Sequence, residues 1–162
     1  TLSARLVFEQ NYGGVDGDSA SSTELYAILS ALAEKPLKHS IAVTGSVNQK
    51  GQVQAIGGVN EKIEGFYEVC KAIGLSGEQG VMSPASNTAN LMLKQEIAEA
   101  VRAGKFHVWA VDTIEDGIEV LSGIPAHPSI EGGSSKPGIF SLVDKRLAQM
   151  AQDLAKLGES RA

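Results

Sequence analysis

The sequence contains a single cysteine, Cys70, so no intramolecular disulfide can form. The lack of disulfides fits a reducing compartment, and we expect a cytoplasmic location. No apolar run approaches the roughly 20 residues that a membrane-spanning helix needs, and residues 1–5 carry no signal-peptide pattern. The chain also lacks an initial Met, so we expect a fragment or a processed product.

Several binding motifs are missing as well. Basic residues are fewer than acidic ones, 14 against 19, which gives a net charge of −5 without a basic cluster. We therefore expect no nucleic-acid partner. No Gly-x-x-x-x-Gly-Lys-Ser/Thr run occurs, so the chain should not bind ATP through a phosphate loop. No Cys/His spacing predicts zinc and no acidic loop predicts calcium, so we expect no metal site.

What the sequence does contain is typical of one folded domain: 162 residues, 43% of them apolar. Hydrophobic periodicity and turn residues predict its elements. The expected strands are 4–9, 40–47, 52–56, 81–84 and 105–111. The first expected helix runs from Ser19 to before Pro36. A second follows the loop 57–60 and has one apolar face, formed by Ile63, Phe66, Tyr67, Cys70 and Ile73. The other expected helices cover 87–103, 114–121 and the residues from 139 onward. Strands that alternate with helices after a hairpin indicate a mixed α/β or α+β class.

The domain itself is expected to cover residues 1–123. The following segment, 124–138, is rich in Pro, Gly and Ser and reads as a linker. It leads to a C-terminal amphipathic helix, so 124–162 form a second part. The apolar stripe of that helix predicts packing on its own domain, on a neighbouring subunit or on a membrane surface, the first two being favoured.

Ser19 is the first candidate for chemistry. It follows the glycine-rich segment 11–18 and begins a helical pattern. A helix N-terminus offers unpaired N–H groups that can stabilise an oxyanion beside a serine hydroxyl. Serine is also a common helix cap, and Ser21 with Glu24 provides a capping box, so this segment alone favours a structural role.

A serine nucleophile requires a base. The histidines His39, His107 and His127 have no recognisable partner motif, and a Ser-His-Asp triad is without support. Lys62 offers another solution, because it lies in the first turn of a helix, where the helix dipole disfavours a cation. Shielding from water would also favour the neutral amine, which can take a proton from a serine hydroxyl. A solvated lysine between Glu61 and Glu64 is the alternative on local grounds.

Several ordered motifs change that balance. The segments 16–21, 44–47 and 51–62 together resemble the peptidase domain of Lon proteases, and 81–87 resembles the family's strand-Pro-x-x-Asn segment. The run Gly17-Asp18-Ser19-Ala20-Ser21 is similar to the serine box of the B subclass. Lys62 lies 43 residues after Ser19 and 18 after Thr44, which are the separations of the family. The resemblance extends from about residue 4 to about residue 123.

The resemblance implies a role for each matching residue. Ser19 would be the nucleophile and Lys62 its general base. Thr44 would orient the lysine amine, and Asp16 would face the dyad and pair with Lys62 in a resting state. The oxyanion donors would be backbone N–H groups of Asp18, Ser19 and Ala20. A turn aspartate is an equal interpretation of Asp16.

The family also implies an architecture and partners. We expect a Lon-type peptidase domain with small mixed sheets flanked by helices, assembled as a homohexamer that hydrolyses unfolded or damaged polypeptides. ATP and Mg²⁺ would be needed only by an ATPase module that this chain does not contain. Only 18 residues precede Ser19, whereas the family usually has further strands upstream. An inactive assembly fragment is therefore the alternative, and a phosphotransferase is a weaker third.

Overall fold

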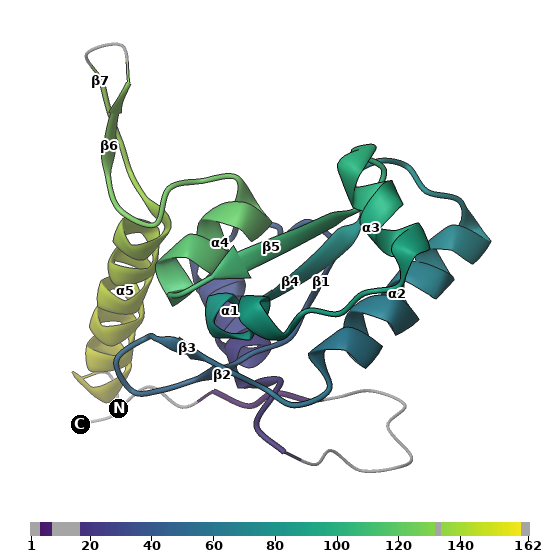
Figure 1. The fold of residues 1–162 in the computed structure, drawn as a ribbon. Coiled ribbons are helices and arrows are strands. Elements are labelled where there is room, and N and C mark those ends of the chain that lie inside the picture. Colours follow the sequence, from purple (N-terminus) through teal and green to yellow (C-terminus); the bar gives the residue numbers. More distant parts are fainter. Residues whose placement is uncertain (1–3, 8–16, 132–133, 160–162) are drawn as a thin grey trace.

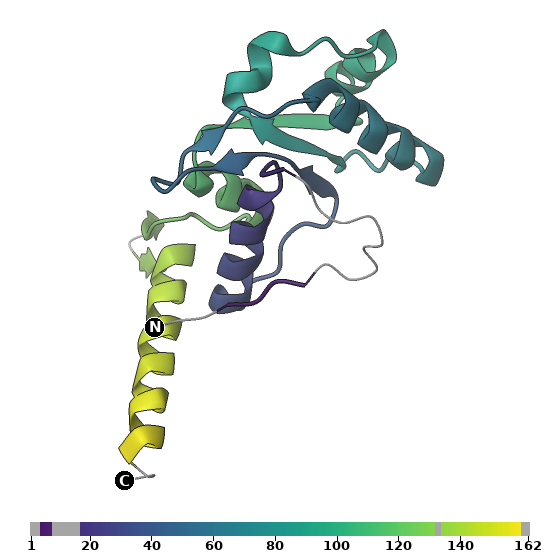
Figure 2. The same ribbon diagram turned by 90° about the horizontal axis from the view of Figure 1, so that it is seen from below.

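The computed structural model describes residues 4–7, 17–131 and 134–159. Its centre is a parallel sheet of three strands, β1 (Ile41–Val43), β4 (Gly80–Pro84) and β5 (His107–Val111), in the order β1-β4-β5. Helices α1 (Ser21–Ala33), α4 (Ile114–Ser122) and α5 (Ile139–Glu159) lie on one side of the sheet, and α2 (Val59–Ile73) and α3 (Gln95–Arg102) on the other (Figure 1, Figure 2). The expected mixed α/β class is confirmed.

Each face of the sheet has its own apolar core. Met82 of β4 packs into the cluster of α1, α4 and α5, whereas its neighbour Val81 packs into the cluster of α2 and α3. Successive strand residues point to opposite faces, so one short apolar strand serves both cores. Ile63 and Phe106 are completely buried in the second cluster.

The expected strand 40–47 is two strands. After β1 the chain bends at Thr44 and Gly45, and β2 (Ser46–Val47) leaves the sheet to pair in an antiparallel hairpin with β3 (Val53–Gln54). The hairpin itself is confirmed. Gly51 has φ 75° in its turn, where the Asn48 side chain accepts bonds from two backbone N–H groups.

The expected helix 87–103 is wrong in its first half. A 3-10 helix, η1 (Ala85–Asn90), is followed by an extended stretch, and α3 begins only at Gln95. The Asn60 side chain accepts from Met92 N–H and donates to the Asn90 carbonyl. Side-chain bonds of this kind satisfy backbone groups that would otherwise favour a helix.

Three further expectations need correction. Residues 4–7 form no strand, and the rest of the expected strand 4–9 lies outside the described residues. Ile73, at the last position of α2, is 80% exposed instead of buried. The 124–138 segment contains a hairpin of β6 (Ser129–Glu131) and β7 (Ser134–Lys136). The division of the chain at residue 123 stays a prediction.

Helix α5 packs along α1 through its first half only. Ile139 and Val143 are buried, whereas Leu154 is 65% exposed. Arg146 of α5 lies 3.9 Å from Glu34 at the end of α1. The favoured expectation, packing on its own domain, therefore holds for the first turns of this helix.

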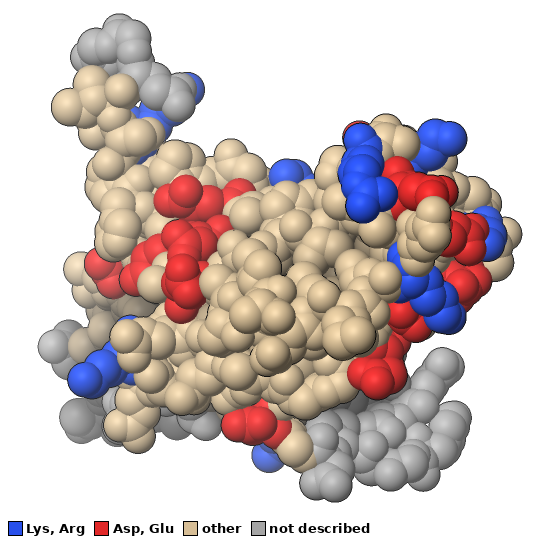
Figure 3. Space-filling model, in the orientation of Figure 1, with Lys and Arg blue, Asp and Glu red and all other residues tan. Residues whose placement is uncertain are grey.

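Charge is unevenly spread over the surface seen in Figure 1. Acidic side chains gather over α4, both signs mix over α2 and α3, and the middle of this face is uncharged (Figure 3). Among the described residues, no helix is both long enough and apolar enough to cross a lipid bilayer.

Candidate active site

Ser19 lies directly before helix α1, where Ala20 is the N-cap. No side chain caps the helix. The hydroxyls of Ser21 and Ser22 bind the segment 45–47 instead. Ser21 does not form the expected capping box, because its hydroxyl accepts a bond from the N–H of Val47 at 3.0 Å. The structural interpretation of this serine-rich segment as a helix cap is therefore wrong.

Lys62 reaches Ser19 from a different helix. It is the fourth residue of α2, which begins after Gly58 in the left-handed conformation, φ 67°. The Lys62 Nζ lies 2.9 Å from the Ser19 Oγ and 3.2 Å from the Thr44 Oγ1. The fold thus brings together three polar groups that the sequence places far apart.

Thr44 occupies the point where β1 ends and the chain bends. Its N–H donates to the carbonyl of Met82 at 3.0 Å, which continues the parallel pairing by one bond. Thr44 is 8% exposed, and its hydroxyl lies between Lys62 and the backbone of Ser19. A buried threonine at a strand end gives the lysine amine a fixed second partner.

Lys62 itself is exposed. The shielding from water that would favour a neutral amine is therefore not supplied by the described residues of this chain. The start of α2 still places the amine near the positive end of a helix dipole. Within the described residues Lys62 makes no ion pair, and its polar partners are the two hydroxyls.

The expected oxyanion donors are the backbone N–H groups of residues 18–20. Within the described residues, the N–H groups of Asp18, Ser19 and Ala20 make no hydrogen bond. They stand at the N-terminus of α1, where the helix dipole favours negative charge. The Asp18 carboxylate instead accepts a bond from the Ser46 hydroxyl at 2.8 Å. Asp16 lies outside the described residues.

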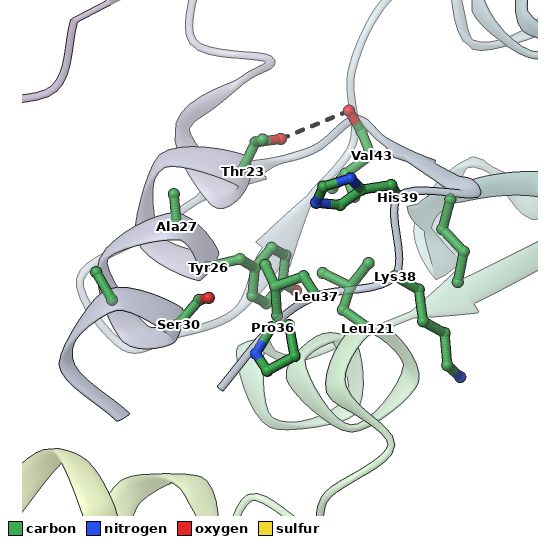
Figure 4. A pocket seen from close by; sticks show the side chains of 12 residues that line it. Thr23, Tyr26, Ala27, Ser30, Pro36, Leu37, Lys38, His39, Val43 and Leu121 are labelled. Carbon is green, nitrogen blue, oxygen red and sulfur yellow. Dashed lines mark hydrogen bonds between the residues drawn. The ribbon is translucent and has the colours of Figure 1, made fainter. Parts of the chain in front are cut away.

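A small pocket opens beside the serine and the lysine. Its volume is about 250 Å³, and its walls are the three polar residues and the small apolar side chains of Ala20, Ala42, Val43 and Val81. A larger pocket, about 420 Å³, lies against α1, the segment 36–39 and α4 (Figure 4). Neither Ser19 nor Lys62 lines that larger pocket, so the larger pocket is not the candidate active site.

None of the histidines forms a triad with Ser19 in the described part of the chain. The His107 ring binds the Gly77 carbonyl at 2.7 Å, and His127 packs its ring on Phe140. His39 lines the larger pocket in Figure 4. Among the described residues, Lys62 is therefore the basic side chain that contacts the Ser19 hydroxyl.

Four residues around Ser19 were not singled out from the sequence for their contacts. Asp18, Ser21 and Ser22 each bind the segment 45–47, and Ser46 is the partner of Asp18. The signal was present, since residues 18–23 contain more hydroxyl and carboxyl groups than one helix cap uses.

Comparison with known proteins agrees with this geometry. Residues 13–122 match the family described as the Lon protease (S16) C-terminal proteolytic domain. A Lon protease homolog of Escherichia coli (strain K12) is 45% identical over 151 residues, 93% of this chain and 25% of the relative. A Lon protease homolog of Haemophilus influenzae is 47% identical over 122 residues, 75% of this chain and 20% of the relative.

Archaeal relatives are more distant. An archaeal Lon protease of Methanothermobacter thermautotrophicus is 38% identical over 114 residues, 70% of this chain and 16% of that protein. The chain thus spans a quarter or less of the length of these relatives. The match covers the serine segment, the bend and the start of α2. The chain belongs to the Lon protease (S16) C-terminal proteolytic domain family.

Proposed function

We propose that this chain is the peptidase unit of a Lon-type serine endopeptidase, with Ser19 as nucleophile and Lys62 as general base. The observation that carries the proposal is the 2.9 Å distance between the Ser19 Oγ and the Lys62 Nζ, which lies within the range of a proton transfer. Family membership supports the reaction class. Ser19 and Lys62 are 43 residues apart, so their contact is a product of the tertiary fold and not of local chain geometry.

The first half of the reaction forms an acyl-enzyme. The neutral Lys62 amine takes the proton of the Ser19 hydroxyl while the Oγ attacks the carbonyl carbon of the scissile peptide bond. The oxyanion accepts bonds from the backbone N–H groups of residues 18–20. When the tetrahedral intermediate collapses, the carbon–nitrogen bond breaks and the Lys62 ammonium gives its proton to the leaving amine.

The second half releases the product. Lys62, neutral again, takes a proton from a water molecule that attacks the ester carbonyl. Collapse of the second intermediate frees the new carboxyl end, and the proton returns from Lys62 to the Ser19 oxygen. Throughout, Thr44 holds the amine from its other side at 3.2 Å.

The exposure of Lys62 places one requirement on this cycle. Water has to leave the amine before it can act as a base, because desolvation favours the neutral form of a lysine. The bound polypeptide and a neighbouring subunit are the groups that supply this cover in our proposal. Asp16 remains the proposed partner that holds the lysine charged in the resting state.

The intact protein is proposed to act on unfolded or damaged polypeptides as a cytoplasmic homohexamer. ATP and Mg²⁺ would serve an ATPase module in that protein and would not bind to this chain. The alternative is an inactive assembly unit, which the exposure of Lys62 favours. The two candidates differ in one measurable property, the hydrolysis of short peptides.

The test uses Ser19→Ala and Lys62→Ala in the intact protein. Hydrolysis of fluorescent casein and of a short fluorogenic peptide should fall by roughly 10⁴-fold or more in each variant, because the two groups act as a unit. Lys50→Ala, at an exposed lysine in the turn between β2 and β3, is the matched control and should keep the parent rate. Parent activity in either dyad variant would refute the assignment, and an inactive parent protein would favour the assembly role.

A further inference from the structure

Ser22 is a buried polar residue for which the proposed chemistry gives no role. It lies in the first turn of α1 and is 1% exposed. Its hydroxyl donates to the Gly45 carbonyl at 2.8 Å, and its own N–H donates to the same oxygen at 3.2 Å. Ser22 is the second residue of the helix, after the N-cap Ala20, and its hydroxyl binds the bend that follows β1.

The bend binds the serine segment in return. The N–H of Gly45 donates to the carbonyl of Ser19 at 2.8 Å, and the Thr44 hydroxyl donates to that carbonyl at 3.3 Å. Ser22 therefore holds the Gly45 carbonyl, while Gly45 holds the backbone of the nucleophile. These hydrogen bonds join residues 19–22 to residues 44–45 in both directions.

Position 45 has little room for a side chain, because both Val53 of β3 and Ser22 lie close to it. A Cβ on Gly45 would lie 2.9 Å from the Val53 Cγ1 and 3.2 Å from the Ser22 Oγ. Two outer bonds flank this contact, from Ser46 to the Asp18 carboxylate at 2.8 Å and from Val47 N–H to the Ser21 hydroxyl at 3.0 Å. The start of α1 is thereby bound to the segment 45–47 through Ser21 and Ser22 as well as through Asp18 and Ser19.

We propose that Ser22 is a positioning residue for the peptidase reaction, acting through Gly45 on Ser19. The inference rests on the proposed function. Thr44 and Gly45 are consecutive, so the bend that carries the lysine's partner also fixes the nucleophile. Ser22 does not line the pocket beside Ser19 and Lys62, and so it touches no substrate.

The consequence is a loss of rate without a loss of binding. Removing the Ser22 hydroxyl leaves the Gly45 carbonyl with one of its two donors, and the Ser19 backbone gains freedom relative to Lys62. A displacement of about 1 Å in a reacting group can lower the rate about 100-fold. KM should change little, because the pocket walls are unaltered.

The experiment compares Ser22→Ala with Ser30→Ala in the intact protein. Ser30 lies on the same helix, and its hydroxyl also donates to a backbone carbonyl, that of Lys35 at 2.6 Å. We measure kcat and KM on a fluorogenic peptide, the rate at which a fluorophosphonate labels Ser19, and the melting temperature. Ser22→Ala should lower kcat and the labelling rate about 10- to 100-fold, and Ser30→Ala should keep both at parent values.

A second variant separates positioning from packing. Ser22→Cys keeps the shape of the side chain, with sulfur somewhat larger than oxygen, and replaces the hydroxyl by a weaker donor. In a variant that its melting temperature shows to be folded, kcat should again fall. Parent kcat and parent labelling in folded Ser22→Cys would overturn the proposal, as they would in Ser22→Ala. Failure of the proposed function has a different signature, because the parent protein itself would then show neither turnover nor label on Ser19.

Discussion

The substitution Thr44→Val tests the geometry around Lys62 with little change in volume. Valine keeps the branched shape of threonine and replaces its hydroxyl by a methyl group. Two contacts disappear, the 3.2 Å bond from the Lys62 Nζ and the 3.3 Å bond to the Ser19 carbonyl. The Ser19 carbonyl keeps its bond from Gly45 at 2.8 Å. The nucleophile therefore stays in place, and the lysine amine loses its second fixed partner.

The size of the effect follows from the bonds removed. A hydrogen bond to a charged group contributes about 1.5–3 kcal/mol, and about 1.4 kcal/mol corresponds to tenfold in rate. If the bond to Thr44 keeps the amine aligned in the transition state, kcat should fall about 10- to 150-fold. The free energy of unfolding should change by about 1 kcal/mol or less, because the exposed lysine can bind water instead.

The assay is steady-state hydrolysis of a fluorogenic peptide by the intact protein, with urea unfolding as the measure of stability. Thr88→Val, at an exposed threonine of η1, is the matched control and should leave kcat unchanged. A kcat within twofold of the parent in folded Thr44→Val would show that the hydroxyl does not orient the lysine. A loss of kcat in Thr88→Val would show that the assay reports a general effect.

Three further predictions concern groups away from the dyad. The Tyr26 hydroxyl is buried without a partner among the described residues, and burial together with Asp116 raises its pKa. Tyr26→Phe should raise the free energy of unfolding by about 1 kcal/mol in urea titrations, and a loss of that size would contradict the assignment. Burial raises the pKa of the Cys70 thiol, so iodoacetamide should label it much more slowly in native than in urea-unfolded protein; equal rates would contradict the burial. A hydrogen bond from Lys71 lowers the pKa of Glu96 below its ordinary value of 4.5. The ionised carboxylate therefore stabilises the folded state above pH 4.5, and this stabilisation is lost as the pH falls through the lowered pKa. The urea midpoints of parent and Glu96→Gln should therefore differ slightly at pH 6 and converge in acid, and a difference that grows in acid would have the wrong sign.

Local sequence signals predicted most elements correctly. Helix α4 begins at a complete capping box of Thr113 and Asp116 and ends at Gly123, and the turn from Asn48 to Gly51 produces the expected hairpin. The prediction of one helix over 87–103 was wrong because the side chain of the distant Asn60 binds the backbone at Asn90 and Met92. Hydrophobic periodicity indicates which secondary structure a segment favours. It does not show which side chains from other segments will hydrogen-bond to its backbone.

The candidate site also has a part that the sequence predicted and a part that depends on the tertiary structure. Ser19, Lys62 and Thr44 were named from the sequence through the resemblance to the family, whose ordered motifs and separations they match. Local signals alone favoured a structural role for the serine segment and a solvated Lys62. The sequence could not reveal that Lys62 is exposed or that Ser22 binds the bend at Gly45. Both depend on how closely α1 and α2 approach the end of β1, a distance set by the packing of the two apolar cores.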